Sequence, residues 1–158
     1  MMNALSSEEQ ILAGVSDDWN RIVGTWVDGD MELNELYLTN YDAPIAVLGN
    51  MPVNMTTEYS YLGRVLCNET AKVKNCVKMK ANTYINEEEG QRFIAAFFSK
   101  FNIPAPTDAK MQMQTEIELV TEASSLYPHH VTERKIVTMP SPQGQQQKID
   151  SKEYRFHY

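Results

Sequence analysis

The two cysteines of this 158-residue chain are the residues whose type and spacing most clearly permit chemistry. Cys67 and Cys76 have eight residues between them, and each stands at the end of a run in which apolar and polar residues alternate. Alternation with a period of two is typical of a half-buried strand, so the cysteines are expected where the two strands of a hairpin diverge. We therefore predict a Cys67–Cys76 disulfide, which implies an oxidising compartment.

In a regular hairpin the two cysteines would lie on opposite faces of the sheet. Cys67 falls on the apolar face of its run, whereas Cys76 is in step with Lys78 and Lys80. Cross-strand neighbours in a regular hairpin share a face. The pair therefore requires a bulge or an irregular stretch, which we expect around Asn75.

Histidine is the other residue type with obvious chemistry, and the chain has three: His129, His130 and His157. Adjacent strand residues point to opposite faces, so His129 and His130 cannot hold one metal ion from a regular strand. Neither has cysteine or carboxylate neighbours at the usual ligand spacing, and the two cysteines by themselves lack two further ligands. We predict no metal and no cofactor, with His129 and His130 exposed at a strand entry; only folding could bring a cysteine and a histidine together.

Catalytic signatures are missing from the sequence. The chain has no Gly-x-Ser-x-Gly element, no phosphate-binding glycine loop and no dinucleotide fingerprint. This absence favours a binding domain over an enzyme. An enzyme that uses His129, His130 or a buried carboxylate in a cone-shaped cavity remains a further alternative.

Methionine and tyrosine are abundant, with nine and eight residues. Several of them share strand faces with other apolar residues, and such adaptable surfaces suit an apolar ligand or the apolar segment of a partner, as well as an ordinary core. The candidate binding residues are Tyr59, Tyr61, Met111, Met113, Tyr154 and Phe156.

Charge and hydropathy exclude some partners. The net charge of −7 and the pI of about 4.9 argue against nucleic acid, because neutralising phosphates takes clustered lysine and arginine. No apolar run approaches the ~20 residues of a membrane-spanning helix, and no leader is visible at the start. The protein is therefore expected to be either cytoplasmic with reduced cysteines, or extracytoplasmic, periplasmic or lipoprotein-anchored with its leader removed. The predicted disulfide favours the extracytoplasmic protein.

The elements that must position these residues follow from periodicity. Helical spacing predicts amphipathic helices over about 6–28 and 87–101, the second capped by Asn86 with Glu87, Glu88 and Glu89 in its first turn. Strands are expected near 55–67, 72–85, 110–122, 129–139 and 149–158, with one or two short strands between 31 and 48, breaks at Pro44 and Pro52, and a polar loop over 140–147. The prediction is a single α+β domain over 1–158, in which a curved antiparallel sheet of about five to six strands packs two helices on one face.

The expected layout resembles that of periplasmic lipoprotein-carrier half-barrels, of nuclear-transport-factor-like domains and, in part, of small acidic secretion chaperones. Likeness of layout carries little information about function. Our leading hypothesis is a non-enzymatic extracytoplasmic domain that binds an apolar small molecule or a protein partner through its curved sheet. The alternative is a cytoplasmic, acidic, chaperone-like module.

Overall fold

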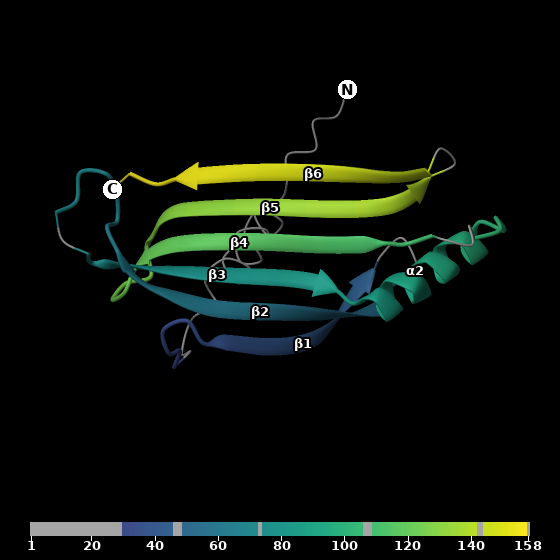
Figure 1. The fold of residues 1–158 in the computed structure, drawn as a ribbon, viewed down its shortest axis with the longest axis horizontal. Helices are drawn as coiled ribbons and strands as arrows, with labels where there is room; N and C mark the ends of the chain where they lie inside the picture. Colours follow the sequence, from purple (N-terminus) through teal and green to yellow (C-terminus); the bar gives the residue numbers. More distant parts are fainter. Residues whose placement is uncertain (1–29, 46–48, 73, 106–108, 142–143, 158) are drawn as a thin grey trace, which may run out of the picture.

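The protein forms one open antiparallel sheet with a helix at one end (Figure 1). The computed structural model describes residues 30–45, 49–72, 74–105, 109–141 and 144–157. Within these residues the elements are β1 (Leu36–Ile45), β2 (Met51–Val65), β3 (Cys76–Ile85), α2 (Glu87–Lys100), β4 (Gln112–Glu122), β5 (Pro128–Ser141) and β6 (Gly144–Arg155). The strands lie in sequence order, so β1 and β6 form the two edges of the described sheet.

The expected fold class is confirmed only in part. The antiparallel sheet has six strands, at the upper end of the expected range, and every neighbouring pair is antiparallel. The described residues contain one helix and not the two that were predicted. The predicted helix over 6–28 lies outside the described residues.

Two prolines that were expected to break the chain lie inside strands. Pro44 is in β1 and is the cross-strand partner of Pro52 in β2. Proline is tolerated here because β1 is an edge strand, and because β3 pairs with β2 only from Met55 onward. The predicted pair of short strands is therefore replaced by β1, and β2 begins before residue 55.

The predicted polar loop over 140–147 is also wrong. β5 continues to Ser141 and β6 begins at Gly144, so the two strands form a long, tight hairpin. Gly144 has a φ of 112°, a conformation that favours glycine. The glutamines that were assigned to a loop are strand residues. Their pattern did not predict a strand, because an edge strand that is exposed on both faces needs no apolar alternation.

The helix over 87–101 is confirmed as α2, and its predicted cap is present. The Asn86 side chain accepts a hydrogen bond from the Glu89 amide at 2.8 Å. Phe93 and Ile94 are buried against Val53 and Met55, but Phe101, which was expected on the sheet, is 50% exposed. The helix crosses only one end of the sheet, so its last turn has no strand beneath it (Figure 1).

The two faces of the sheet differ in character. The face that we call the core face carries Tyr59, Tyr61, Met79, Leu119 and Val131, which form one packed cluster. The opposite face, the polar face, carries Glu58, Asn82, Glu116, Glu118 and Arg134. A second apolar cluster joins α2 to the sheet. This separation is what the alternation of β2, β3 and β4 predicted.

Candidate functional site

The six predicted binding residues lie in different environments. Met111 is buried in the cluster beneath α2, and Met113 packs against that cluster from outside. Tyr59 and Tyr61 are half-buried against the core-face cluster. Tyr154 and Phe156 are 40% and 39% exposed on β6 and just beyond it. The predicted residues are therefore spread from the α2 end of the sheet, at Met111, to the opposite end, at Phe156, and do not gather into one pocket.

Register connects two of them, Tyr61 and Tyr154, in one cross-strand row. Tyr61, Met79, Leu119, Val131 and Tyr154 are successive cross-strand partners from β2 to β6. Leu119 and Val131 are fully buried in the middle of this row, whereas Tyr154 at its end is exposed. The core face thus changes from a sealed core over β3 and β4 to an open surface over β6.

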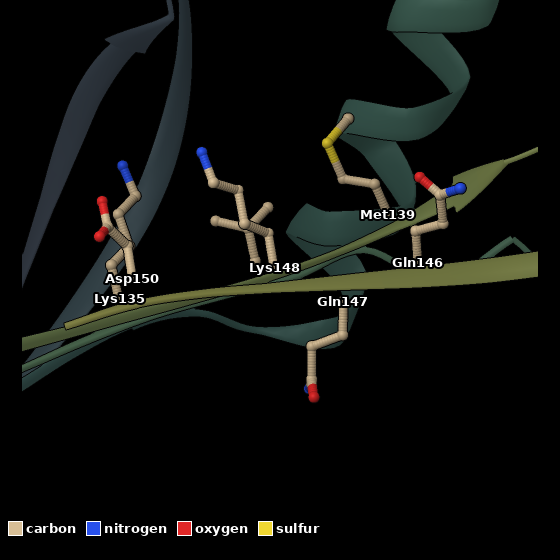
Figure 2. Close-up of a pocket in the computed structure, with 7 residues that line it drawn as sticks. Lys135, Met139, Gln146, Gln147, Lys148 and Asp150 are labelled. Carbon is tan, nitrogen blue, oxygen red and sulfur yellow. The ribbon is translucent and has the colours of Figure 1, made fainter.

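A hollow of about 360 Å³ opens on this surface, over β5 and β6 (Figure 2). Val137 and Met139 provide its apolar base, and Val137 is the cross-strand partner of the predicted residue Met113. The polar side chains around it are those of Lys135, Gln146, Lys148 and Asp150. Figure 2 shows these labelled side chains on one face, while Gln147 points to the other.

The residues that line this hollow were not among the binding residues predicted from the sequence. Lys148 and Asp150 are opposite Val137 and Lys135 only because the β5–β6 hairpin closes tightly. The alternation of Lys135, Val137 and Met139 was a usable signal for one side of the hollow. The other side comes from β6, whose first residues had been assigned to a loop.

A second hollow, of about 450 Å³, lies on the polar face. Its lining is charged and includes Lys80, Glu118, Arg134 and Glu153. Two of the carboxylates are in ion pairs, Glu118 with Lys78 at 2.8 Å and Glu153 with Arg155 at 2.9 Å. The polar face is therefore a surface on which charges of both signs lie close together.

The predicted disulfide is present at the end of the sheet away from α2. The Cα atoms of Cys67 and Cys76 are 5.0 Å apart, within the range that a disulfide requires. The required irregularity is not at Asn75 but in β2, where the register shifts between Tyr61 and Gly63. One extra residue on β2 reverses the faces of all later β2 residues relative to β3 and so brings the cysteines together.

His129 joins this end of the sheet from β5. Its ring and the two sulfurs each offer a ligand atom, and these three atoms lie within 4.8 Å of one another. The His129 side chain is only 12% exposed, so the expectation of an exposed strand-entry residue is wrong. No local pattern could reveal this contact, because it joins residues far apart in the sequence.

The Glu122 carboxylate lies next to His129 and is itself bound by the Ser125 hydroxyl. The Nε2 of His129 lies 3.3 Å from Oε1 of Glu122, and the Ser125 hydroxyl donates to Oε2 of Glu122 at 2.6 Å. The hydrogen bond from Ser125, followed by the contact with His129, lowers the pKa of the Glu122 carboxyl below its ordinary value. The ring of His129 therefore lies against a carboxylate that is ionised at neutral pH.

His130 contacts a different carboxylate, and the register between β4 and β5 shifts at this point, so that His129 is skipped between the pairs Val120–His130 and Thr121–Pro128. The Nε2 of His130 lies 2.8 Å from Oε1 of Glu153, which also accepts a hydrogen bond from Arg155 at 2.9 Å. Arg155, and then His130, lower the pKa of Glu153. The two histidines thus contact different carboxylates on different elements.

Comparison of the chain with protein-family models, with curated proteins and with solved structures finds no match. The three layouts that the sequence resembles therefore remain analogies. Among the described residues, α2 is too short and too polar to span a bilayer, and there is no other helix.

Proposed function

We propose that this protein is a non-enzymatic binding domain that takes an apolar ligand, or the apolar segment of a protein partner, on the core face of its open sheet. The observation that carries the proposal is the hollow of about 360 Å³ over Val137 and Met139. It lies on the core face, outside the packed apolar clusters, and Val137 at its base is the cross-strand partner of the predicted residue Met113.

The chemistry of the hollow indicates what such a ligand resembles. Its volume falls within the range of roughly 300–1,000 Å³ that is typical of small-molecule sites. Valine and a flexible methionine suit an apolar body of adaptable shape. The rim has two ammonium groups, Lys135 and Lys148, and one carboxylate, Asp150, so its charge favours a ligand with a polar or anionic end.

The disulfide supports an extracytoplasmic location, because such bonds persist in oxidising compartments. Intact mass of the protein purified without reductant, measured before and after alkylation, distinguishes this location from the cytoplasmic alternative. A mass without alkyl groups is expected. Alkylation of both thiols in freshly lysed cells would favour the cytoplasmic module.

Dye binding tests the proposed site. The probe is anilinonaphthalene sulfonate, which has an apolar body and an anionic group, and the variant is Val137→Glu. A carboxylate at the base of the hollow should weaken dye binding by about tenfold, equivalent to ~1.4 kcal/mol. The matched control is Ile136→Glu on the same strand, since Ile136 is also half-buried but faces the polar side.

The control variant should keep the dye affinity of the unmodified protein. Equal losses in both variants, or no binding by the unmodified protein, would contradict the proposal. Far-UV circular dichroism of both variants separates loss of the site from loss of the fold. Mass spectrometry of organic extracts of the native protein then distinguishes a bound small molecule from a protein partner.

A further inference from the structure

We propose that this protein contains a redox-dependent site for a thiophilic divalent cation such as Zn²⁺, formed by Cys67, Cys76 and His129 once the disulfide is reduced. The site is at the start of β5, whereas the hollow described above is near the end of that strand. It therefore stands independently of the proposed function.

The geometry of the three ligand atoms carries the proposal. Zinc binds thiolate sulfur at roughly 2.3 Å and imidazole nitrogen at roughly 2.0 Å, so ligand atoms around one ion lie at most about 4.6 Å apart. The atoms of Cys67, Cys76 and His129 lie within 4.8 Å of one another. In the disulfide the two sulfurs are bonded to each other, so on reduction they must separate to about 3.8 Å, the spacing of two thiolates on one tetrahedral zinc, while the histidine is already within reach.

The backbone around the site is held by neighbouring strands. Cys76 is fully buried and pairs with Val65 on β2 and Glu122 on β4. The carbonyl of His129 accepts a hydrogen bond from the Phe156 amide at 2.9 Å. Cys76 and His129 therefore lie on paired strands, β3 and β5, and Cys67 lies two residues after the end of β2.

Glu122 completes the arrangement around the histidine. Histidine ligands commonly donate their second ring N–H to a carboxylate, which fixes the tautomer and strengthens the nitrogen that binds the metal. The Glu122 carboxylate lies 3.3 Å from His129 Nε2 and is itself held by Ser125. The residues behind the proposed ligand are thus those that a zinc site uses.

Reduction converts the disulfide into the ligands. A dithiol reductant transfers two electrons and two protons to the Cys67–Cys76 bond, which yields two thiols, while the reductant itself becomes a disulfide. Zn²⁺ then displaces the two thiol protons and binds both thiolates and the neutral imidazole. Water then takes the fourth position from the side of Cys67, which is half-buried.

The oxidised and metal-bound states exclude each other, since a sulfur in a disulfide cannot be a thiolate. The sequence led us to expect no metal because neither cysteine had a third ligand nearby. The folded chain provides that ligand in His129.

Zinc binding to the full chain tests this inference. Protein reduced with a phosphine, which ends as the phosphine oxide with oxygen from water, is incubated anaerobically with ZnCl2, desalted and analysed for metal. We expect one zinc per reduced chain and almost none per oxidised chain. With Co²⁺ as the probe, the reduced protein should show thiolate-to-cobalt charge-transfer absorption.

The matched variants are His129→Ala and His130→Ala, because these adjacent histidines face different carboxylates. His129→Ala should lower zinc affinity by at least tenfold, whereas His130→Ala should not change it. Equal affinity in the two variants, or equal zinc in oxidised and reduced protein, would overturn the site. If His129→Ala does not fold, Glu122→Gln serves instead, and should weaken binding about tenfold through the imidazole.

Discussion

Individual residues in this protein take their roles from their position along cross-strand rows. Leu119 is completely buried between Met79 and Val131, whereas Tyr154 in the same row is exposed on the edge strand. Aromatic and thioether side chains therefore serve as core in the middle of the sheet and as surface at its margin. Whether such a side chain is buried depends on the number of strands on either side of it and not on its residue type.

Truncation of Leu119 should be among the most costly single changes in the sheet. Leu119→Ala removes a fully buried side chain from the packed cluster, so we expect a loss of about 2–5 kcal/mol in the free energy of unfolding. Urea unfolding measures this loss. The same change at Leu38, which is 61% exposed, should alter stability by no more than about 0.5 kcal/mol; similar losses at both positions would contradict the assigned core.

At the scale of elements, a single inserted residue in β2 decides where the disulfide forms. The bulge between Tyr61 and Gly63 changes the register with β3, and Gly63 adopts a φ of 100° that other residues rarely reach. A Cβ at this glycine would also lie 3.2 Å from Leu33. The bulge therefore depends on glycine for its backbone conformation, and a Cβ there would in addition require the exposed Leu33 side chain to shift slightly.

The helix depends on glycine for a different reason. A Cβ at Gly90 would lie 2.6 Å from the backbone oxygen of Met111, a contact that requires the helix or the neighbouring chain to move. Gly90→Ala should therefore destabilise the protein, although alanine is normally about 1 kcal/mol better than glycine within a helix. Thermal unfolding checks the direction of the change.

An exposed position in the same helix provides the control. Ala95→Gly should cost about 1 kcal/mol, which is the ordinary effect of helix propensity. Glycine would then be favoured at position 90 and alanine at position 95. A more stable Gly90→Ala variant would show that α2 does not approach Met111 this closely.

On the scale of the whole molecule, the described sheet is open, and its last strand has polar side chains on both faces. β6 is exposed along its length and carries Lys148 and Lys152. Charged residues, lysine above all, discourage an edge strand from pairing with another chain. The net charge of −7 opposes self-association as well.

Removal of the two lysines should therefore promote self-association through β6. We expect Lys148→Val/Lys152→Val to form dimers or larger species in sedimentation velocity, at concentrations where the unmodified protein does not change its state. The control, Lys72→Val/Lys74→Val, removes the same charge from the segment between β2 and β3. Equal association in the two variants would assign the effect to net charge and not to the edge strand.

The amino-acid sequence alone determined the local structure of the described chain. Alternation predicted β2, β3 and β4 and the faces of their residues, except beyond the bulge after Tyr61 in β2, and Asn86 with three glutamates predicted the start of α2. These features depend on neighbours a few residues apart, so a single sequence reveals them. The Cys67–Cys76 pairing was also predictable, because its two residues belong to one hairpin.

Tertiary structure alone decided the rest. The position of the bulge, the continuation of β1 through Pro44, the hollow over β5 and β6 and the approach of His129 to the cysteines all depend on which strands lie side by side. Periodicity states which face of a strand a residue occupies but not what lies opposite it. Register settles that question, and register results from the packing of the whole sheet.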